Sequence, residues 1–202
     1  MWVIYGGAFN PPTKAHLCFA SRMLQEPEVE KLIFMPVGNR YDKPELIAAE
    51  HRLAMCRLMA EHDVNFETSS LECDSKTQLG TYHSMMALQK QYPQQQFAFL
   101  TGADNFSYIT KWIEAERLVE NFNIWVMPRE GFDLNALLKQ EPILQKNQSH
   151  LRFLRFLPML DISATEIRQQ ISAGAQRIDS LEEVIMAYIK THELYGAKVE
   201  KN

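Results

Sequence analysis

Residues 2–17 read WVIYGGAFNPPTKAHL, and this stretch sets the fold class of the chain. It opens with a short apolar run, Trp2 to Tyr5, which two glycines stop. A run of this length between turn residues is typical of a strand that is buried on both faces. After the prolines, apolar residues recur on one face of residues 15–25, which predicts a helix. A buried strand followed at once by a helix is the first half of a strand–helix–strand unit.

The same alternation continues along nearly the whole chain. We expect further strands at residues 31–37, 64–71, 97–100, 123–127 and 151–157, and helices at 48–61, 80–92, 105–110, 113–120, 132–142, 164–172 and 181–190. The pattern predicts an α/β protein, a single domain over residues 1–202, with a doubly wound, Rossmann-like parallel sheet and a C-terminal helical portion. Ligands of such folds bind beyond the carboxyl ends of the strands, which directs attention to the loops at residues 6–13, 38–46, 101–105 and 161–163.

The composition excludes several classes of protein. With 202 residues, 46% of them hydrophobic and 23% charged, the chain is globular rather than disordered. The net charge of −4 argues against a nucleic-acid binder, and no apolar run approaches the roughly 20 residues that cross a membrane. The N-terminus lacks the basic leader of a secretory signal, and the three scattered cysteines fit a reducing compartment, so we expect a cytoplasmic protein.

The first loop has the residues of an anion site. Gly6 and Gly7 lack a Cβ, which permits the close approach of a ligand. Thr13 stands where the helix should begin and His16 follows about one turn later, so both side chains can face an anion at the helix N-terminus. An ordinary turn with a capping threonine and an uninvolved histidine is the alternative. The combination of paired glycines, two prolines and Thr-x-x-His favours a functional loop.

Residues 161–168, DISATEIR, carry the second candidate anion site. Ser163 and Glu166 form a capping-box pattern, which predicts that a helix begins here. Thr165 adds a second hydroxyl, and Arg168 places a cation near a helix start, where the helix dipole disfavours positive charge. A bound anion explains that cation, although a capping box by itself needs no ligand. Two such helix starts, far apart in the sequence, suggest that one polyphosphate is held between them.

These two motifs resemble those of a known family of nucleotidyltransferases. GGAFNPPTKAHL, residues 6–17, is similar to the early (H/T)-x-G-H motif of that family, and ISATEIR, residues 162–168, to its late I-S-[SA]-T-x-I-R motif. Within the family the chain most resembles the bacterial nicotinate mononucleotide adenylyltransferases, through further matches along its length. These are TYHSMMALQKQYP at residues 81–93, FAFLTGADNF at 97–106, Trp112, VMPREGF at 126–132 and VIMAYIKTHELY at 184–195.

The resemblance implies that AMP is transferred from ATP to nicotinate mononucleotide, which gives deamido-NAD and pyrophosphate in NAD biosynthesis. It implies Mg²⁺ as the cofactor, bound through water and phosphate oxygens with no metal-ligand residues in the chain. The partners are then ATP and a pyridine mononucleotide, with no nucleic acid and no membrane.

The resemblance also implies a set of site residues. The implied catalytic residues are His16, Thr13 and Arg168. The implied ATP-binding residues are Gly6, Gly7, Ala8, Phe9, Gly102, Asp104, Ile162, Ser163 and Thr165, and the implied substrate-binding residues are Thr81, Tyr82, Trp112, Arg129 and Lys43.

Some of these residues keep a second interpretation. Asp104 is also a candidate N-cap of the next helix, and Trp112 is a candidate core residue. Lys43 and Arg52 could bind a phosphate, but we expect them to be solvated cations of a loop and a helix.

The acceptor of the AMP group stays open at this point. Residues 37–43, VGNRYDK, lack the P-P-H-K run of the family, and Thr13 and Ala15 stand where the family usually has His and Gly. Nicotinamide mononucleotide and phosphopantetheine are therefore alternative acceptors. A nucleotide-binding module without turnover is the alternative from a different class.

Overall fold

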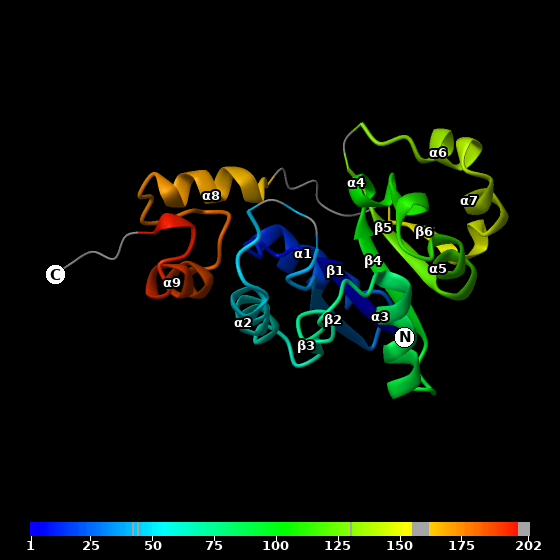
Figure 1. The fold of residues 1–202 in the computed structure, drawn as a ribbon, viewed down its shortest axis with the longest axis horizontal. Helices are drawn as coiled ribbons and strands as arrows, with labels where there is room; N and C mark the ends of the chain where they lie inside the picture. Colours follow the sequence, from blue (N-terminus) through cyan, green and yellow to red (C-terminus); the bar gives the residue numbers. More distant parts are fainter. Residues whose placement is uncertain (42, 44, 130, 155–161, 198–202) are drawn as a thin grey trace.

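The computed structural model describes residues 1–41, 43, 45–129, 131–154 and 162–197. In these ranges the strands are β1 Trp2–Gly7, β2 Lys31–Pro36, β3 Phe66–Thr68, β4 Phe97–Gly102, β5 Asn123–Met127 and β6 Leu151–Phe153. They form one parallel sheet in the order β3-β2-β1-β4-β5-β6 (Figure 1). The chain winds outward from β1 on one side and from β4 on the other, so the predicted doubly wound Rossmann-like sheet is confirmed.

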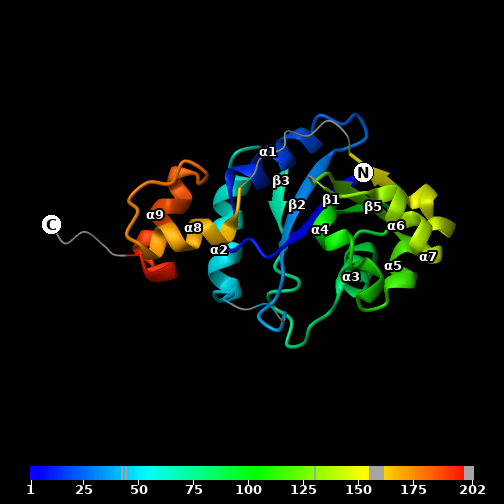
Figure 2. The same ribbon diagram turned by 90° about the horizontal axis from the view of Figure 1, so that it is seen from above.

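Helices cover both faces of this sheet. They are α1 Lys14–Met23, α2 Ala49–Ala60, α3 Thr81–Gln91, α4 Ala103–Phe106, α5 Ala115–Asn121, α6 Leu134–Gln140 and α7 Pro142–Lys146. In β1, Val3 and Tyr5 pack with α1 and α2, whereas Ile4 packs with α3, α4, α5 and α7 on the other face. Figure 2 shows α1 and α3 on opposite sides of the sheet. The strands are apolar throughout because both of their faces are buried.

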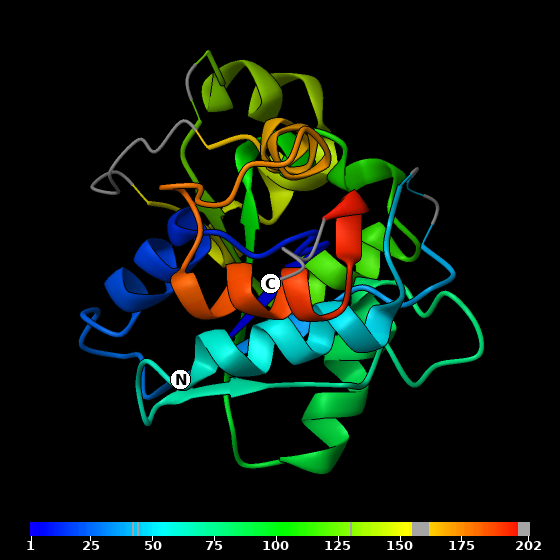
Figure 3. The same cartoon turned by 90° about the vertical axis from the view of Figure 1, so that its left-hand side faces the viewer.

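The C-terminal helices α8 Ala164–Ser172 and α9 Glu183–Thr191 pack on the outer side of α2. Met55 of α2, Ile167 of α8 and Ile189 of α9 are buried together in this third core. Figure 3 shows α9 running along α2. Helix α2 is therefore packed on two sides, since Cys56 and Met59 face the sheet and Met55 faces the C-terminal helices.

Two boundaries differ from the sequence prediction for a physical reason. Strand β3 is shorter than the predicted residues 64–71, because Val64 is 95% exposed and a turn begins at Leu71. The helix predicted to end at Pro142 is followed directly by a second helix, α7, which Pro142 begins. Proline is tolerated at that first position because the N–H it lacks would have no partner within the helix.

The other elements follow the expected pattern with small changes. The helix predicted at 105–110 is divided into α4 and the 3-10 turn η1 Ile109–Lys111. The strand predicted at 151–157 is seen as β6, and residues 155–157 lie outside the described residues. The remaining short turns are η2 Gln148–His150 and η3 Leu194–Gly196. Nowhere in the described ranges is a helix both long enough and apolar enough to cross a membrane.

The packing of β1 against β4 can be tested at Gly6. A Cβ built on Gly6 would lie 2.4 Å from Cζ of the Phe99 ring, which fills the space beside this glycine. We expect Gly6→Ala to lower the free energy of unfolding by about 1–3 kcal/mol, because an added methyl forces a packed core to shift. Denaturant unfolding measures this change. In a Phe99→Leu background the same substitution should cost less, and an equal cost in both backgrounds would contradict this packing.

Candidate active site

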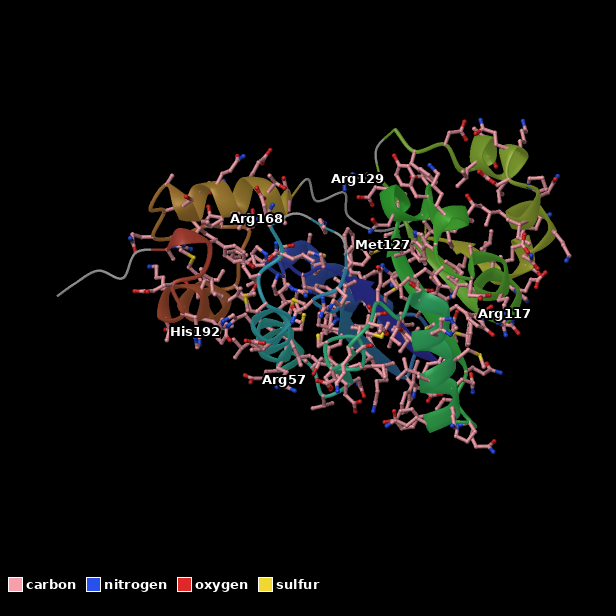
Figure 4. The ribbon with its side chains drawn as sticks, in the orientation of Figure 1. Arg57, Arg117, Met127, Arg129, Arg168 and His192 are labelled. Carbon is pink, nitrogen blue, oxygen red and sulfur yellow. The ribbon has the colours of Figure 1, made fainter. Side chains whose placement is uncertain are left out.

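The candidate site lies where β1 and β4 part, at the carboxyl edge of the sheet. The first loop follows β1, α4 follows β4, and the N-terminus of α8 comes to this edge from the far end of the chain. Figure 4 shows Arg168 of α8 and Arg129, which follows β5, on the upper side of the view, whereas Arg57 and His192 lie on the lower side. Two neighbouring parallel strands whose connections leave in opposite directions create the usual ligand position of such sheets.

Thr13 and His16 are joined at the start of α1. Thr13 stands at the start of α1, as predicted, where it is the N-cap, and its backbone N–H donates to Nδ1 of His16 at 3.0 Å. The Thr13 hydroxyl lies 2.8 Å from the same nitrogen. Because Nδ1 accepts the backbone N–H, we assign the ring proton of neutral His16 to Nε2. The imidazole therefore has a donor nitrogen that is not used by Thr13.

His16 is held in its neutral form. Burial, and secondarily the positive charge of Lys43, lower the pKa of its imidazole from an ordinary 6.5 to about 4. The ring packs against the rings of Phe9 and Tyr5, at centroid distances of 5.0 and 5.9 Å. At neutral pH His16 is thus an uncharged hydrogen-bond donor rather than a cation.

Arg168 of α8 contacts the first loop directly. Its Nη1 donates to the carbonyl oxygen of Asn10 at 3.1 Å, across 158 residues of sequence. Its Nη2 donates to Oε2 of Glu45 at 2.7 Å and to Oγ1 of Thr165 at 3.3 Å. The structure therefore brings the late cation to the loop that carries Thr13 and His16.

Asn10 connects three segments at this point, and the sequence interpretation overlooked it. Its side chain is buried; Nδ2 donates to the carbonyl of Glu45 at 2.9 Å, and Oδ1 accepts from the N–H of Ile47 and the hydroxyl of Tyr195. A polar residue placed between Phe9 and two prolines was the available signal, because a buried amide needs several partners. Asn10 thus fixes the first loop to the second loop and to the C-terminal segment.

Arg52 is not a solvated helix cation, and that expectation was wrong. Its side chain is 0% exposed, with Nε donating to the carbonyl of Ile47 and Nη1 to the carbonyl of Ala8, both at 3.0 Å. Among the described residues its Nη2 has no partner, and burial lowers the pKa of the guanidinium. The face of α2 that carries Arg52 points into the protein. The spacing of apolar residues in the sequence could not show whether this face is buried or exposed. Lys43, by contrast, is exposed as expected.

The early glycines serve packing within the protein. The Phe99 ring occupies the space beside Gly6, and the Phe9 ring lies 3.2 Å from the position of a Cβ on Gly7. Phe9 itself is buried, with a left-handed φ of 47°. The carbonyl of Ala8 already accepts from Arg52. Nucleotide contacts by these four residues stay a prediction, and packing supplies an independent reason for the two glycines.

An ion pair marks the carboxyl ends of β4 and β5. Arg129 Nη1 lies 3.1 Å from Oδ2 of Asp104, and both side chains are exposed. Gly102 is the N-cap of α4, so the interpretation of Asp104 as the cap was wrong, and Asp104 stands in the first turn instead. A Cβ on Gly102 would lie 2.6 Å from Oδ1 of Asp104, so the glycine leaves room for that carboxylate.

The predicted acceptor residues on the other face of the sheet differ in exposure. Tyr82 is 4% exposed and packs in the core, with the guanidinium of Arg117 4.6 Å from the ring centre. Thr81 begins α3 and is partly buried. Trp112 is partly buried, and its ring packs edge-on against Phe99 with the ring centres 5.9 Å apart. Phe99 is the residue whose ring fills the space beside Gly6, so Trp112 lies next to that packing contact. Contacts of these residues with a substrate stay a prediction.

The start of α8 is capped as its sequence predicts. Ser163 Oγ accepts from the N–H of Glu166 at 3.3 Å. Thr165 is exposed within hydrogen-bond distance of Arg168, and Ile162 packs partly buried against the C-terminal core. Asp161, the first residue of the predicted motif, lies outside the described residues. Together the neutral His16, the hydroxyls and Arg168 make up a candidate anion-binding site on an α/β protein.

The family model described as cytidylyltransferase-like matches residues 4–170. The chain therefore belongs to the cytidylyltransferase-like family, whose members are nucleotidyltransferases.

Individual relatives cover nearly the full length of the chain. It is similar to a probable nicotinate-nucleotide adenylyltransferase of Acholeplasma laidlawii, 32% identical over 196 residues, which cover 96% of this chain and 97% of that protein. A second such relative, from Clostridium tetani, is 32% identical over 195 residues, covering 95% and 97%. Among solved structures, a nicotinic acid mononucleotide adenylyltransferase of Plasmodium falciparum complexed with NaAD matches with a TM-score of 0.79 at 22% identity, covering 98% of each chain. That structural likeness independently supports the fold.

The protonation of His16 can be measured by NMR. We expect its ring to be neutral at pH 6, with the proton on Nε2 because Nδ1 accepts the Thr13 N–H, and to titrate near pH 4 because burial and the charge of Lys43 disfavour the cation. Long-range ¹H–¹⁵N spectra report both properties, and His16→Gln should remove the corresponding signals. A ring that titrates near 6.5 would contradict the assignment.

The lowered pKa of His16 also predicts how the free energy of unfolding changes with pH. Between about pH 4 and 6.5 the unfolded chain binds a proton at residue 16 that the folded chain does not bind. The contribution of His16 to stability is therefore full above pH 6.5 and is lost as the pH falls toward 4, by at most about 3.5 kcal/mol. In the His16→Gln variant the free energy of unfolding should not show this part of the decrease between pH 6.5 and 4.

Proposed function

We propose that this chain transfers the AMP group of ATP to nicotinate mononucleotide, releasing pyrophosphate and forming deamido-NAD. The observation that carries the proposal is the contact of Arg168 with the Asn10 carbonyl, which joins the late cation to the loop of Thr13 and His16. The full-length relatives described as probable nicotinate-nucleotide adenylyltransferases support the choice of reaction.

The chemistry needs no nucleophilic side chain. An oxygen of the mononucleotide phosphate, which is ionised at neutral pH, attacks the α-phosphorus of ATP. One P–O bond forms there, and the bond from the α-phosphorus to the α–β bridging oxygen breaks, so that pyrophosphate leaves with the electron pair. Catalysis then consists of alignment and stabilisation of developing charge.

His16 supplies the donor at the reacting phosphorus. Its Nε2–H is free of the Thr13 contact and donates to a nonbridging oxygen of the α-phosphate as negative charge builds there. The ring starts neutral and ends neutral, so it stabilises charge without having to give up its proton. Thr13 fixes the ring through Nδ1 and holds the start of α1 at the same phosphate.

The α8 end of the site would bind the departing pyrophosphate. Arg168 supplies a planar cation, and Ser163 and Thr165 supply hydroxyls at the N-terminus of a nine-residue helix. ATP enters as its magnesium complex, in which phosphate oxygens and water complete the coordination of the ion. Gly102 and Asp104 are the proposed contacts of the adenosine ribose.

The acceptor would lie against the other half of the carboxyl edge. Thr81, Trp112 and Arg129 are its proposed contacts, with Lys43 near the phosphate and Tyr82 supporting α3 from within the core. We also propose a cytoplasmic location, which the three free cysteines support.

The reaction and its acceptor are tested together by a substrate panel. With MgATP we expect pyrophosphate release to be fastest with nicotinate mononucleotide, and slower or absent with nicotinamide mononucleotide and phosphopantetheine. Product mass identifies the dinucleotide. A preference for another acceptor would revise the substrate alone. ATP binding without pyrophosphate release from any acceptor would instead favour a nucleotide-binding module without turnover.

The role of His16 is tested by its removal. We expect His16→Ala to lower kcat by about 10²-fold or more, because a donor to the transition state is lost. His62→Ala is the matched control, since His62 is an exposed histidine outside the site. Steady-state kinetics measure both variants, and near wild-type turnover in His16→Ala would remove His16 from catalysis.

A further inference from the structure

Arg168 is paired with a carboxylate at the position where the proposed function needs a phosphate. Oε2 of Glu45 lies 2.7 Å from Nη2 of Arg168, across 123 residues of sequence. The other guanidinium nitrogen, Nη1, donates to the Asn10 carbonyl, and Nη2 also reaches Thr165. Of the described groups that Arg168 contacts, Glu45 alone carries a charge.

The two partners of this ion pair differ in exposure. The Arg168 side chain is 15% exposed, whereas that of Glu45 is 70% exposed. An exposed carboxylate gains little from such a pair and can return to water at small cost. The partly buried guanidinium loses more when it has no anion beside it, because its charge is less well solvated.

The backbone of Glu45 is fixed independently of its side chain. Its carbonyl accepts from Nδ2 of the buried Asn10 at 2.9 Å, and its φ of 62° lies in the left-handed region. The side chain can therefore leave Arg168 by rotation about its own bonds, while the contact between the second loop and Asn10 persists.

We propose that Glu45 is a placeholder anion, which neutralises Arg168 in the free protein and is displaced by the phosphate chain of ATP. This rests on the proposed function in one respect, since it takes that phosphate chain as the ligand of Arg168. Breaking the ion pair between Glu45 and Arg168 costs free energy when the nucleotide binds, which lowers the affinity for the nucleotide. The displaced carboxylate also stays close enough to repel the bound phosphates. Glu45 therefore sets the affinity for ATP without touching the reacting atoms.

The test is a binding measurement that does not require turnover. Calorimetric titration with MgATP, and separately with pyrophosphate, should give a dissociation constant about two- to five-fold lower for Glu45→Gln than for the wild type, as expected for the loss of a competing surface ion pair. The gain should shrink at high salt. Glu61→Gln, which removes an equal charge at an exposed position at the end of α2, should leave binding unchanged.

A double-mutant comparison ties the effect to Arg168. In an Arg168→Gln background Glu45→Gln should no longer tighten binding, because there is no cation to compete for. Weaker or unchanged binding in the single variant, or an equal gain in the Arg168→Gln background, would overturn the placeholder. Failure to release pyrophosphate from any acceptor would overturn the proposed function instead, and the binding comparison would still decide the role of Glu45.

Discussion

The hydrogen bond from Arg168 to the carbonyl of Asn10 is the contact on which the site depends. It joins α8 to the first loop and so brings the two candidate anion-binding helix starts together, alongside the Tyr195 hydroxyl on Asn10 and the N–H of Lys14 on the carbonyl of Ser180. Asn10 can make this contact because its buried amide is bonded to the backbone of the second loop and to Tyr195. A loop held from three directions keeps its carbonyl in one place, and that preorganisation spares the protein the cost of ordering the loop when a ligand binds.

The neutral state of His16 has the same origin in local packing. Thr13 is both the cap of α1 and the donor to Nδ1, so the turn that begins the helix also determines which ring nitrogen carries the proton. The rings of Phe9 and Tyr5 shield the imidazole and disfavour its cation. The positive charge of the site is therefore left to arginine and lysine side chains, and the histidine is kept as a directional donor.

The sequence predicted the sheet well because its strands are nearly continuous apolar runs, as Phe97–Leu100 and Asn123–Met127 illustrate. It predicted the helix start at Thr13 and the cap at Ser163 because such signals depend on neighbours a few residues apart. It did not predict that Phe99 fills the space beside Gly6, that Arg52 is buried, or that Asn10 is bonded to distant segments. Each of these depends on a partner tens of residues away, and local patterns of polarity contain no information about such partners.

Helix α2 is shared between the sheet core and the C-terminal core, and this has a consequence for synthesis of the chain on the ribosome. The six described strands all end before residue 154, so the sheet can form on the ribosome before α8 and α9 have left the exit tunnel. In a nascent chain at that stage the Met55 side of α2 is uncovered, and Arg168 is not yet in contact with Asn10. The candidate anion site therefore cannot be complete until α8 has left the ribosome and packed on α2, so shorter nascent chains would lack one of its two helix starts.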